Sequence, residues 1–296
     1  MNRLPVETRA KIIGCLVEGM SMRATTRIVG CSINTVTKLL VDLGTACALY
    51  QNETMRNLEC KRVQVDEIWA FCHSKKKNTP MHMRAAGHGD VWTWVAIDAD
   101  TKLVPSFYVG ARDADSAHAF IGDLAGRIKA KTRVQLTSDG HKPYLQAVED
   151  AFGANVDYAM LVKLYGNPDG HQQERRYSAG ECCGAIKGAV CGNPDEKHIS
   201  TSYVERQNLS LRMGNRRFTR LTNAFSKKIE NHAHALAIYY MHYNFGRIHK
   251  TLRVTPATLA GAHHQFRQLL DRLGRTGQSA IEIGRASCRE RVLVQG

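Results

Sequence analysis

The chain has 296 residues, of which 43% are hydrophobic and 23% charged, a balance typical of a globular protein with a buried core. Lysine and arginine number 41 against 27 acidic residues, so the formal net charge is +14 and a polyanionic partner such as nucleic acid is favoured. No apolar run is long enough to span a membrane and the first residues lack the apolar core of a signal peptide, which predicts a cytoplasmic protein with no membrane partner. The nine cysteines are scattered and odd in number, which indicates reduced thiols rather than a disulfide framework.

Three short helices are predicted at the start of the chain, because apolar residues recur there at helical spacing. Ser21 and Ser32 stand where the second and third helices would begin, and serine is a favoured N-cap. Gly30 separates these two helices. The expected bounds, with the capping serines included, are Glu7–Met20, Ser21–Val29 and Ser32–Leu43. A short helix, a glycine-containing turn and a polar-faced helix form a helix-turn-helix pattern.

A helix-turn-helix unit places its last helix in the major groove of DNA. The side chains that we expect to face the bases are Ser32, Asn34, Thr35 and Lys38. A small helical bundle used only for protein contacts is the alternative, but the nearby cations Arg23 and Arg27 favour DNA. We therefore assign residues 1–50 to a helix-turn-helix DNA-binding domain and residues 51–62 to a linker.

From Val63 onward the sequence changes from helical to strand patterns. Three segments rich in β-branched and aromatic residues come first, and strands and helices then alternate. The expected strands are Val63–Cys72, Val91–Ile97, Leu103–Val109, Arg133–Thr137 and Asn155–Val162, with helices at Ser116–Ile128 and Tyr144–Phe152. This order predicts an α/β fold, in which an antiparallel meander continues into a parallel sheet with flanking helices.

Residues 164–200 have no clean period and are rich in Gly, Asn, Asp and Lys, so we expect a loop that becomes ordered on binding. Four potential zinc ligands lie in this segment, but their irregular spacing favours free thiols. They are Cys182, Cys183, Cys191 and His198. Three further helices are expected, at Ser202–Met213, at Phe225–Tyr243 and after Thr255.

The last part of the chain receives a separate interpretation. Residues 63–262 are assigned to one domain and residues 263–296 to a C-terminal tail. Within the tail, Glu282–Val292 resembles the translation of a sequencing adapter. We therefore exclude the end of the chain from the fold prediction as a sequence-assembly artefact.

Three acidic residues are candidates for a shared metal site. Asp66 lies inside a strand that should be buried, where a carboxylate is costly without a partner or a metal ion. Asp139 follows the strand Arg133–Thr137, at the end of the sheet where ligands bind in open α/β folds. Glu205 is the only acid between residues 199 and 228 and lies early in a predicted helix. Alternation along the first strand places Glu67 on the face opposite Asp66, away from this site.

Convergent carboxylates of this kind can hold two metal ions about 3.5–4 Å apart for phosphodiester cleavage. The ions expected are Mg²⁺ or Mn²⁺, which accept hard oxygen ligands. Taken separately, each acid also fits a common structural role: a salt-bridged strand residue, a turn residue or a surface ion pair.

The predicted helix that carries Glu205 continues into a strongly basic stretch. Residues 205, 208 and 212 share one helix face, and the residues that follow contain no acid up to position 228. We expect this surface to follow DNA phosphates. The side chains assigned to it are Asn208, Arg212, Arg216, Arg217 and Arg220.

Three segments resemble the signature blocks of insertion sequence 1 family transposases. They are VDEIWAF (65–71), SDGHKPY (138–144) and YVERQNLSLRMGNRRFTRLTNAFSKK (203–228). The resemblance spans about residues 63–260, and its long third block is the most specific. It implies an RNase H-like mixed sheet with flanking helices and a catalytic, metal-binding triad of Asp66, Asp139 and Glu205. The sequence departs from some members in having no Cys-x-x-Cys pair ahead of the helix-turn-helix.

The function that the resemblance implies is that of a bacterial, nucleoid-associated DDE transposase. It would cleave double-stranded DNA at transposon ends and join those ends to target DNA, as a homo-oligomer assembled on the DNA. Two alternatives stay open at this stage. One is an inactive relative that binds transposon ends without cutting them, and the other is a different RNase H-like nuclease.

Overall fold

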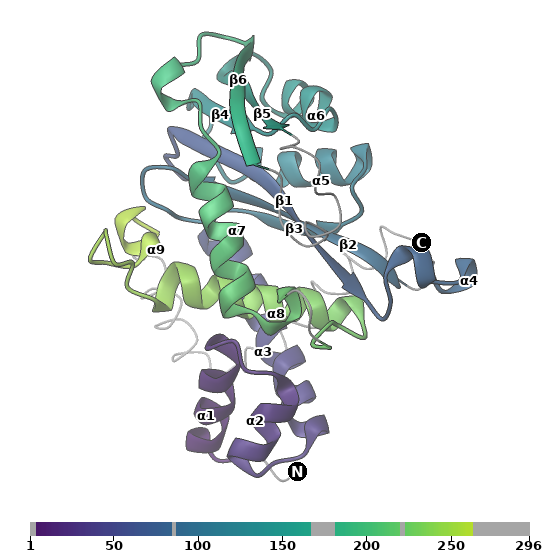
Figure 1. The fold of residues 1–296 in the computed structure, drawn as a ribbon. Coiled ribbons are helices and arrows are strands. Elements are labelled where there is room, and N and C mark those ends of the chain that lie inside the picture. Colours follow the sequence, from purple (N-terminus) through teal and green to yellow (C-terminus); the bar gives the residue numbers. More distant parts are fainter. Residues whose placement is uncertain (1–3, 85–86, 167–180, 220–222, 263–296) are drawn as a thin grey trace.

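The computed structural model describes residues 4–84, 87–166, 181–219 and 223–262 (Figure 1). The expected tail, residues 263–296, and the candidate DNA contact Arg220 lie outside these ranges. In the ranges that are described, no helix is both long enough and apolar enough to cross a membrane.

The chain begins with three helices, α1 (Val6–Val17), α2 (Met22–Val29) and α3 (Ile33–Thr54). The predicted serine caps are present: Ser21 Oγ accepts the amide of Ala24 at 3.1 Å, and Ser32 Oγ accepts that of Thr35 at 3.1 Å. Gly30 ends α2 with φ 71°, a left-handed conformation that favours glycine. These helices lie at one end of the molecule (Figure 1).

Helix α3 is longer than the sequence predicted, since it ends at Thr54 rather than Leu43. Its second half packs against α8 (Ile229–Met241), and the Gln51 side chain donates to the Ala237 carbonyl at 3.0 Å. At Gly44 the two helices come so close that a Cβ would lie 2.4 Å from the His234 Cβ. Residues 51–54, expected to belong to the linker, are therefore part of a helix that a partner distant in sequence stabilises.

A six-stranded mixed sheet forms the centre of the molecule, with strand order β3-β2-β1-β4-β5-β6. Strands β1, β2 and β3 form an antiparallel meander, β4 and β5 continue parallel to β1, and β6 returns antiparallel to β5. Their bounds are β1 Arg62–Cys72, β2 Gly89–Asp98, β3 Phe107–Gly110, β4 Val134–Ser138, β5 Val156–Gly166 and β6 Glu181–Cys191. The predicted α/β class with a mixed sheet and flanking helices is confirmed.

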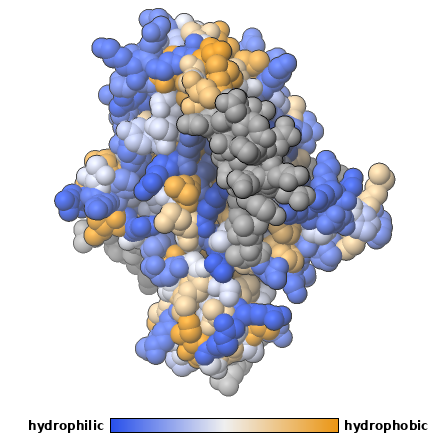
Figure 2. All heavy atoms as spheres, in the orientation of Figure 1, coloured by the Kyte–Doolittle hydropathy of each residue, from blue (hydrophilic) through white to orange (hydrophobic). Residues whose placement is uncertain are grey.

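Two strands differ from the prediction. β6 lies within the segment expected to be a loop, and it is held by backbone pairing with β5. β3 begins at Phe107 rather than Leu103, although the Asp98 amide still donates to the Leu103 carbonyl at 2.8 Å. Exposed apolar side chains gather on β5 and β6, at the top of Figure 2.

Helices cover both faces of the sheet. Helices α5 (Ala114–Ala125) and α6 (Pro143–Phe152) pack on one face, around Trp94, Phe120 and Tyr144. Helices α7 (Ser202–Gly214) and α8 pack on the other face, and Figure 1 shows α7 lying across β1. Shorter elements complete the described chain: η1 Lys76–Asn78, α4 Met81–Arg84, η2 Gly153–Asn155, η3 Glu196–His198, η4 Arg216–Phe218, the π-helical turn His242–Gly246 and α9 Pro256–Leu259.

The turn between α1 and α2 lies close to the C-terminal end of α7. Gly19, in the turn between α1 and α2, has φ 77°, and a Cβ there would lie 2.9 Å from the carbonyl oxygen of Gly214. Close by, Arg217 Nη2 lies 3.3 Å from Met22 Sδ. The turn between α1 and α2 therefore packs on the C-terminal end of α7.

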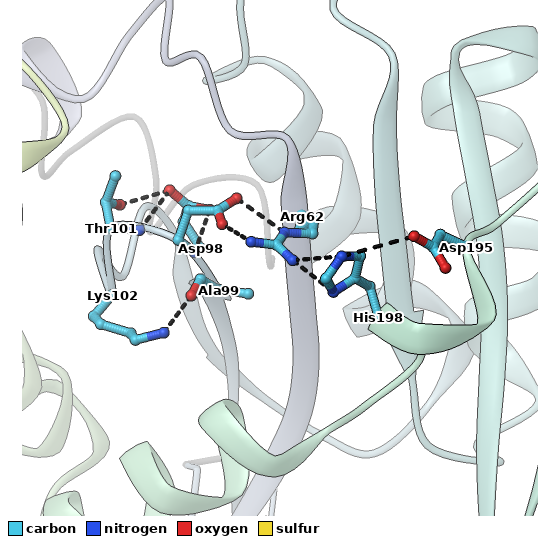
Figure 3. A network of polar contacts seen from close by, with 8 residues as sticks. Arg62, Asp98, Ala99, Thr101, Lys102, Asp195 and His198 are labelled. Carbon is cyan, nitrogen blue, oxygen red and sulfur yellow. Dashed lines mark hydrogen bonds and ion pairs between the residues drawn. The ribbon is translucent and has the colours of Figure 1, made fainter.

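A polar network fixes the segment that leads into α7 (Figure 3). Arg62, at the start of β1, forms an ion pair with Asp100 and lies 2.6 Å from His198 Nδ1. His198 closes η3, and its Nε2 lies 3.7 Å from Asp195. These contacts fix the position of η3 against the start of the central strand, four residues before α7 begins.

Candidate metal centre

Three carboxylates meet where β1 and β4 separate. The parallel pairing of these strands ends at Gln64 and Thr137, and Asp66 and Asp139 each lie two residues further on. One oxygen from each of Asp66, Glu67 and Asp139 lies within 4.8 Å of the others. Among the described residues, this is the one group of His, Cys, Asp or Glu side chains placed closely enough to share a metal ion.

Asp66 is half-buried and points to the face covered by α7. The Asn208 side chain of α7 donates to its Oδ2 at 2.8 Å. Burial, with a smaller contribution from the Asp139 charge, raises the pKa of Asp66 to about 6. Like charges held this close are typical of a site that a divalent cation would neutralise.

Glu67 belongs to this cluster, contrary to the expectation that it faces away from the site. It does point to the opposite face of β1, but Asp139 lies in the gap between the strands and is reached from both faces. The Glu67 side chain is 1% exposed, with Arg112 Nε at 3.4 Å and His141 Nε2 at 3.5 Å from its Oε1. Burial and, to a smaller extent, the charges of Asp139 and Asp66 raise its pKa to about 8. The sequence signal that could have identified Glu67 is that it is a second acidic residue in a strand predicted to be buried.

Glu205 comes from the first turn of α7 and lines the same cavity as Asp66 and Asp139. It is held apart from the three-acid cluster by two contacts. Its Oε2 lies 2.5 Å from Lys163 Nζ, and its Oε1 accepts the Thr201 hydroxyl at 2.6 Å. The third member of the predicted triad therefore faces the cavity but is paired with a lysine.

Strand β1 fixes the start of α7 directly. The buried Gln64 Oε1 accepts the backbone amides of Tyr203 at 2.8 Å and Val204 at 3.2 Å. Gln64 thus satisfies amides that a helix N-terminus leaves unpaired. The Gln64 contacts and the contact between Asn208 and Asp66 together fix the position of Glu205 relative to β1. Gln64 was not among the residues predicted from the sequence to support the site.

The acids line a cavity of about 720 Å³ that also contains positive charge. Arg112, Lys142 and Lys163 line its wall, with His141 beside Asp139. Arg112 bridges the acids, since its Nη2 lies 3.8 Å from Asp139 Oδ2, and its guanidinium packs over the Trp92 ring at 4.9 Å. The carboxylate oxygens are suited to binding metal ions, and the basic side chains are suited to binding phosphate. The lining of the cavity therefore suits a metal-bound phosphodiester.

The residues expected to face the bases lie at the start of α3. Asn34 is exposed, and Lys38 is 70% exposed with an ion pair to Asp42 at 2.7 Å. Ser32 is exposed but its hydroxyl caps the helix, and Thr35 Oγ1 bonds to that same hydroxyl at 2.9 Å. Asn34 and Lys38 are therefore the two of these four side chains best placed to reach a ligand.

Two of the five side chains assigned to the phosphate-following surface have other contacts. Asn208 is 7% exposed and bonded to Asp66. Arg217 is half-buried, and its Nη1 donates to Ser226 Oγ at 2.9 Å. In the structure without DNA both side chains are therefore engaged within the protein, because α7 turns Asn208 toward the sheet and Arg217 is held against Ser226. Arg216 is exposed and Arg212 is half-buried.

The four potential zinc ligands are not grouped around one point. Cys182, Cys183 and Cys191 are exposed on β6, while His198 lies against Arg62.

Comparison with known proteins adds little to this geometry. No protein-family model matches the sequence, and no curated protein matches it either. Among solved structures, the chain is similar to the Mos1 transposase paired-end complex with left transposon end, at 15% identity and a TM-score of 0.24. The match covers 53% of this chain and 60% of that chain, so it includes less than two thirds of that protein. At this TM-score the likeness does not establish a shared fold.

Proposed function

We propose that this protein is a DDE transposase, which cleaves DNA at transposon ends and joins those ends to target DNA. The observation that carries the proposal is the convergence of Asp66, Asp139 and Glu205 on one cavity from three separate elements. An antiparallel meander followed by two parallel strands also agrees with the RNase H-like fold that the sequence resemblance implies. The net charge of +14 supports a nucleic-acid substrate.

Asp66 and Asp139 would hold two Mg²⁺ or Mn²⁺ ions, with Glu205 as a further ligand of the second. When bound, such ions activate the attacking oxygen and stabilise the departing one. The protein's own residues set the geometry of that reaction. Asn208 orients the Asp66 carboxylate, Arg112 bridges Glu67 and Asp139, and Gln64 fixes the helix that presents Glu205.

The reaction consists of two in-line displacements at phosphorus. In the first, the oxygen of water attacks the phosphodiester at the transposon end and the 3′-oxygen leaves. In the second, that 3′-hydroxyl attacks a target phosphodiester, and a target 3′-oxygen leaves. One bond forms as one breaks in each step, so the joining step requires no nucleoside triphosphate.

The N-terminal helices would bind the terminal repeats through α3, with Asn34 and Lys38 toward the bases. A homo-oligomer assembled on the two ends would bring both of them to target DNA. In this proposal the protein acts in the bacterial nucleoid.

The decisive experiment measures binding and chemistry separately. A duplex that carries the element's own terminal repeat is incubated with the protein in Mg²⁺, and end binding, hydrolysis and strand transfer are quantified. We expect D66N, D139N and E205Q each to abolish hydrolysis and joining while leaving end binding intact, because each amide keeps the shape and removes the charge. End binding without cleavage by the unsubstituted protein would instead indicate an inactive relative. Cleavage of an RNA–DNA hybrid alone would indicate a different nuclease.

A further inference from the structure

Lys163 occupies a position in the cavity that the proposed mechanism does not yet use. It lies on β5, which pairs with β4, the strand that ends just before Asp139. Its ammonium lies 2.5 Å from Glu205 Oε2, and its side chain is 30% exposed. A lysine paired with the third acid of a proposed metal site requires an explanation.

Both oxygens of Glu205 are already engaged, one by Thr201 and the other by Lys163. A divalent cation that binds the Glu205 carboxylate would lie close to both of these partners. The Thr201 hydroxyl is neutral, whereas the ammonium would be strongly repelled by a nearby dication. Lys163 is therefore the partner that leaves.

The released ammonium has a suitable ligand close by. Lysine carries a compact charge on a flexible four-carbon stem and binds phosphate as a point charge. Lys163 lines the same cavity as Asp66 and Asp139, where the proposed function places the scissile phosphodiester. The nearest alternative acids in the cavity are themselves the proposed metal ligands.

We infer that Lys163 exchanges partners during the reaction cycle: it pairs with Glu205 in the free protein and with a non-bridging phosphate oxygen of DNA once metal ions are bound. The phosphate contact rests on the proposed function. The exchange at Glu205 does not, because it requires only that the acids bind a divalent cation. Before the ions bind, Lys163 would reduce the electrostatic repulsion between the acids and DNA. After the ions bind, the same side chain would hold the substrate.

The first test measures Mn²⁺ binding to the protein without DNA, by the loss of the free-ion electron paramagnetic resonance signal. We expect K163M to bind Mn²⁺ about twofold to fivefold more tightly, the range expected for removal of one partly exposed ion pair. K163R, which keeps the charge, should bind as the unsubstituted protein does. In an E205Q background, K163M should produce no further change, because the two effects act through one contact.

A matched control is available on the surface. Lys129 and Glu59 form a pair of the same length, 2.5 Å, between exposed side chains away from the cavity. K129M removes the same charge and should leave Mn²⁺ affinity unchanged. An unchanged affinity in K163M, or an equal increase in K129M, would overturn the exchange.

The second test measures binding to a duplex in Ca²⁺, used as a non-catalytic ion, at several salt concentrations. Loss of one phosphate contact should lower the slope of log affinity against log salt by about one unit in K163M. If K163M binds Mn²⁺ more tightly but keeps the salt slope of the unsubstituted protein, the phosphate contact is overturned. The release of Lys163 from Glu205 on metal binding would still be supported. Failure of the proposed function itself would appear separately, as absence of cleavage by the unsubstituted protein.

Discussion

At the scale of single residues, Glu67 changes the composition of the candidate site. Its carboxylate is almost fully buried and contacts Arg112 and His141 at the back of the acid cluster. Strand alternation alone assigned it to the wrong environment, because Asp139 enters the gap between two diverging strands and is reached from both faces.

We therefore expect E67Q to lower metal-dependent cleavage by about 10- to 100-fold, the usual cost of losing a residue that supports a metal ligand. The variant should fold normally at pH 7, because burial raises the pKa of Glu67 to about 8 and the fold accepts a neutral group there. Cleavage rate and melting temperature are measured together, with the exposed Glu149→Gln on α6 as the control. Equal activity in the two variants would remove Glu67 from the site.

His232 should make the stability of the protein depend on pH. The ring is fully buried against Phe218, with Nδ1 2.9 Å from Ser226 Oγ, and burial lowers its pKa from 6.5 to about 3. Because the folded state keeps the ring neutral, protons bind mainly to the unfolded chain between these two values. This contribution to stability is present above pH 6.5 and is lost as the pH falls, by about 2 kcal/mol at pH 5.

Urea unfolding at pH 5, 6, 7 and 8 measures this effect. H232Q should remove that part of the pH dependence, at a cost in stability at pH 8. The exposed His82→Gln is the control and should retain the full dependence. The same slope in H232Q and in the unsubstituted protein would show that another group is responsible.

At the scale of secondary-structure elements, the long second half of α3 depends on its contact with α8. Gly44 lies at the point of closest approach, where any side chain meets the backbone of His234. G44A should lower the free energy of unfolding by about 1–3 kcal/mol or more, the range for forcing extra atoms into a packed contact. G14A, in an open position on α1, should instead stabilise by about 0.5–1 kcal/mol. Denaturant titrations of both variants test this, and a harmless G44A would contradict the packing of α3 on α8.

The elements that the sequence predicted well are those with local signals. Ser21, Ser32 and Thr255 cap helices as expected, and the strands that alternate with α5 and α6 lie close to their predicted bounds. These features depend on neighbours within four residues, so a single sequence carries them.

The elements that were missed depend on distant partners. β6 contains Gly184, Ala185 and Gly188, which are residue types depleted in strands, and it forms because it pairs with β5. The same reasoning applies to the site. The sequence positions of three acids, in or beside predicted strands or in a basic helix, were enough to predict Asp66, Asp139 and Glu205 as site residues. No comparable sequence feature marks Arg112 and Lys163, because only the folded sheet places them beside carboxylates.

At the scale of the whole molecule, we expect discrimination between DNA sequences to depend on α3 and sequence-independent DNA affinity to depend on the basic surface beyond α7. N34A should reduce discrimination between a transposon end and random DNA by about 1–3 kcal/mol, the value of one lost base contact. R216A, at an exposed cation beyond α7, should weaken binding to all sequences alike and lower the salt slope by about one unit. Competition binding at several salt concentrations separates the two. Loss of discrimination in R216A, with none in N34A, would reverse the assignment of these surfaces.

The contact between Gly19 and Gly214 has a consequence for the DNA itself. One rigid helix joins the turn of the N-terminal unit to the first-turn acid Glu205, and from Glu205 to Gly214 it measures about 14 Å. If α3 binds the bases of the transposon end, α7 sets a fixed distance between those bases and the bond that is cut. Each base pair inserted between them would rotate that bond by about 35° around the duplex axis. An insertion of five base pairs would turn it to the opposite side of the DNA, so that the end would still be bound but would no longer face the acids.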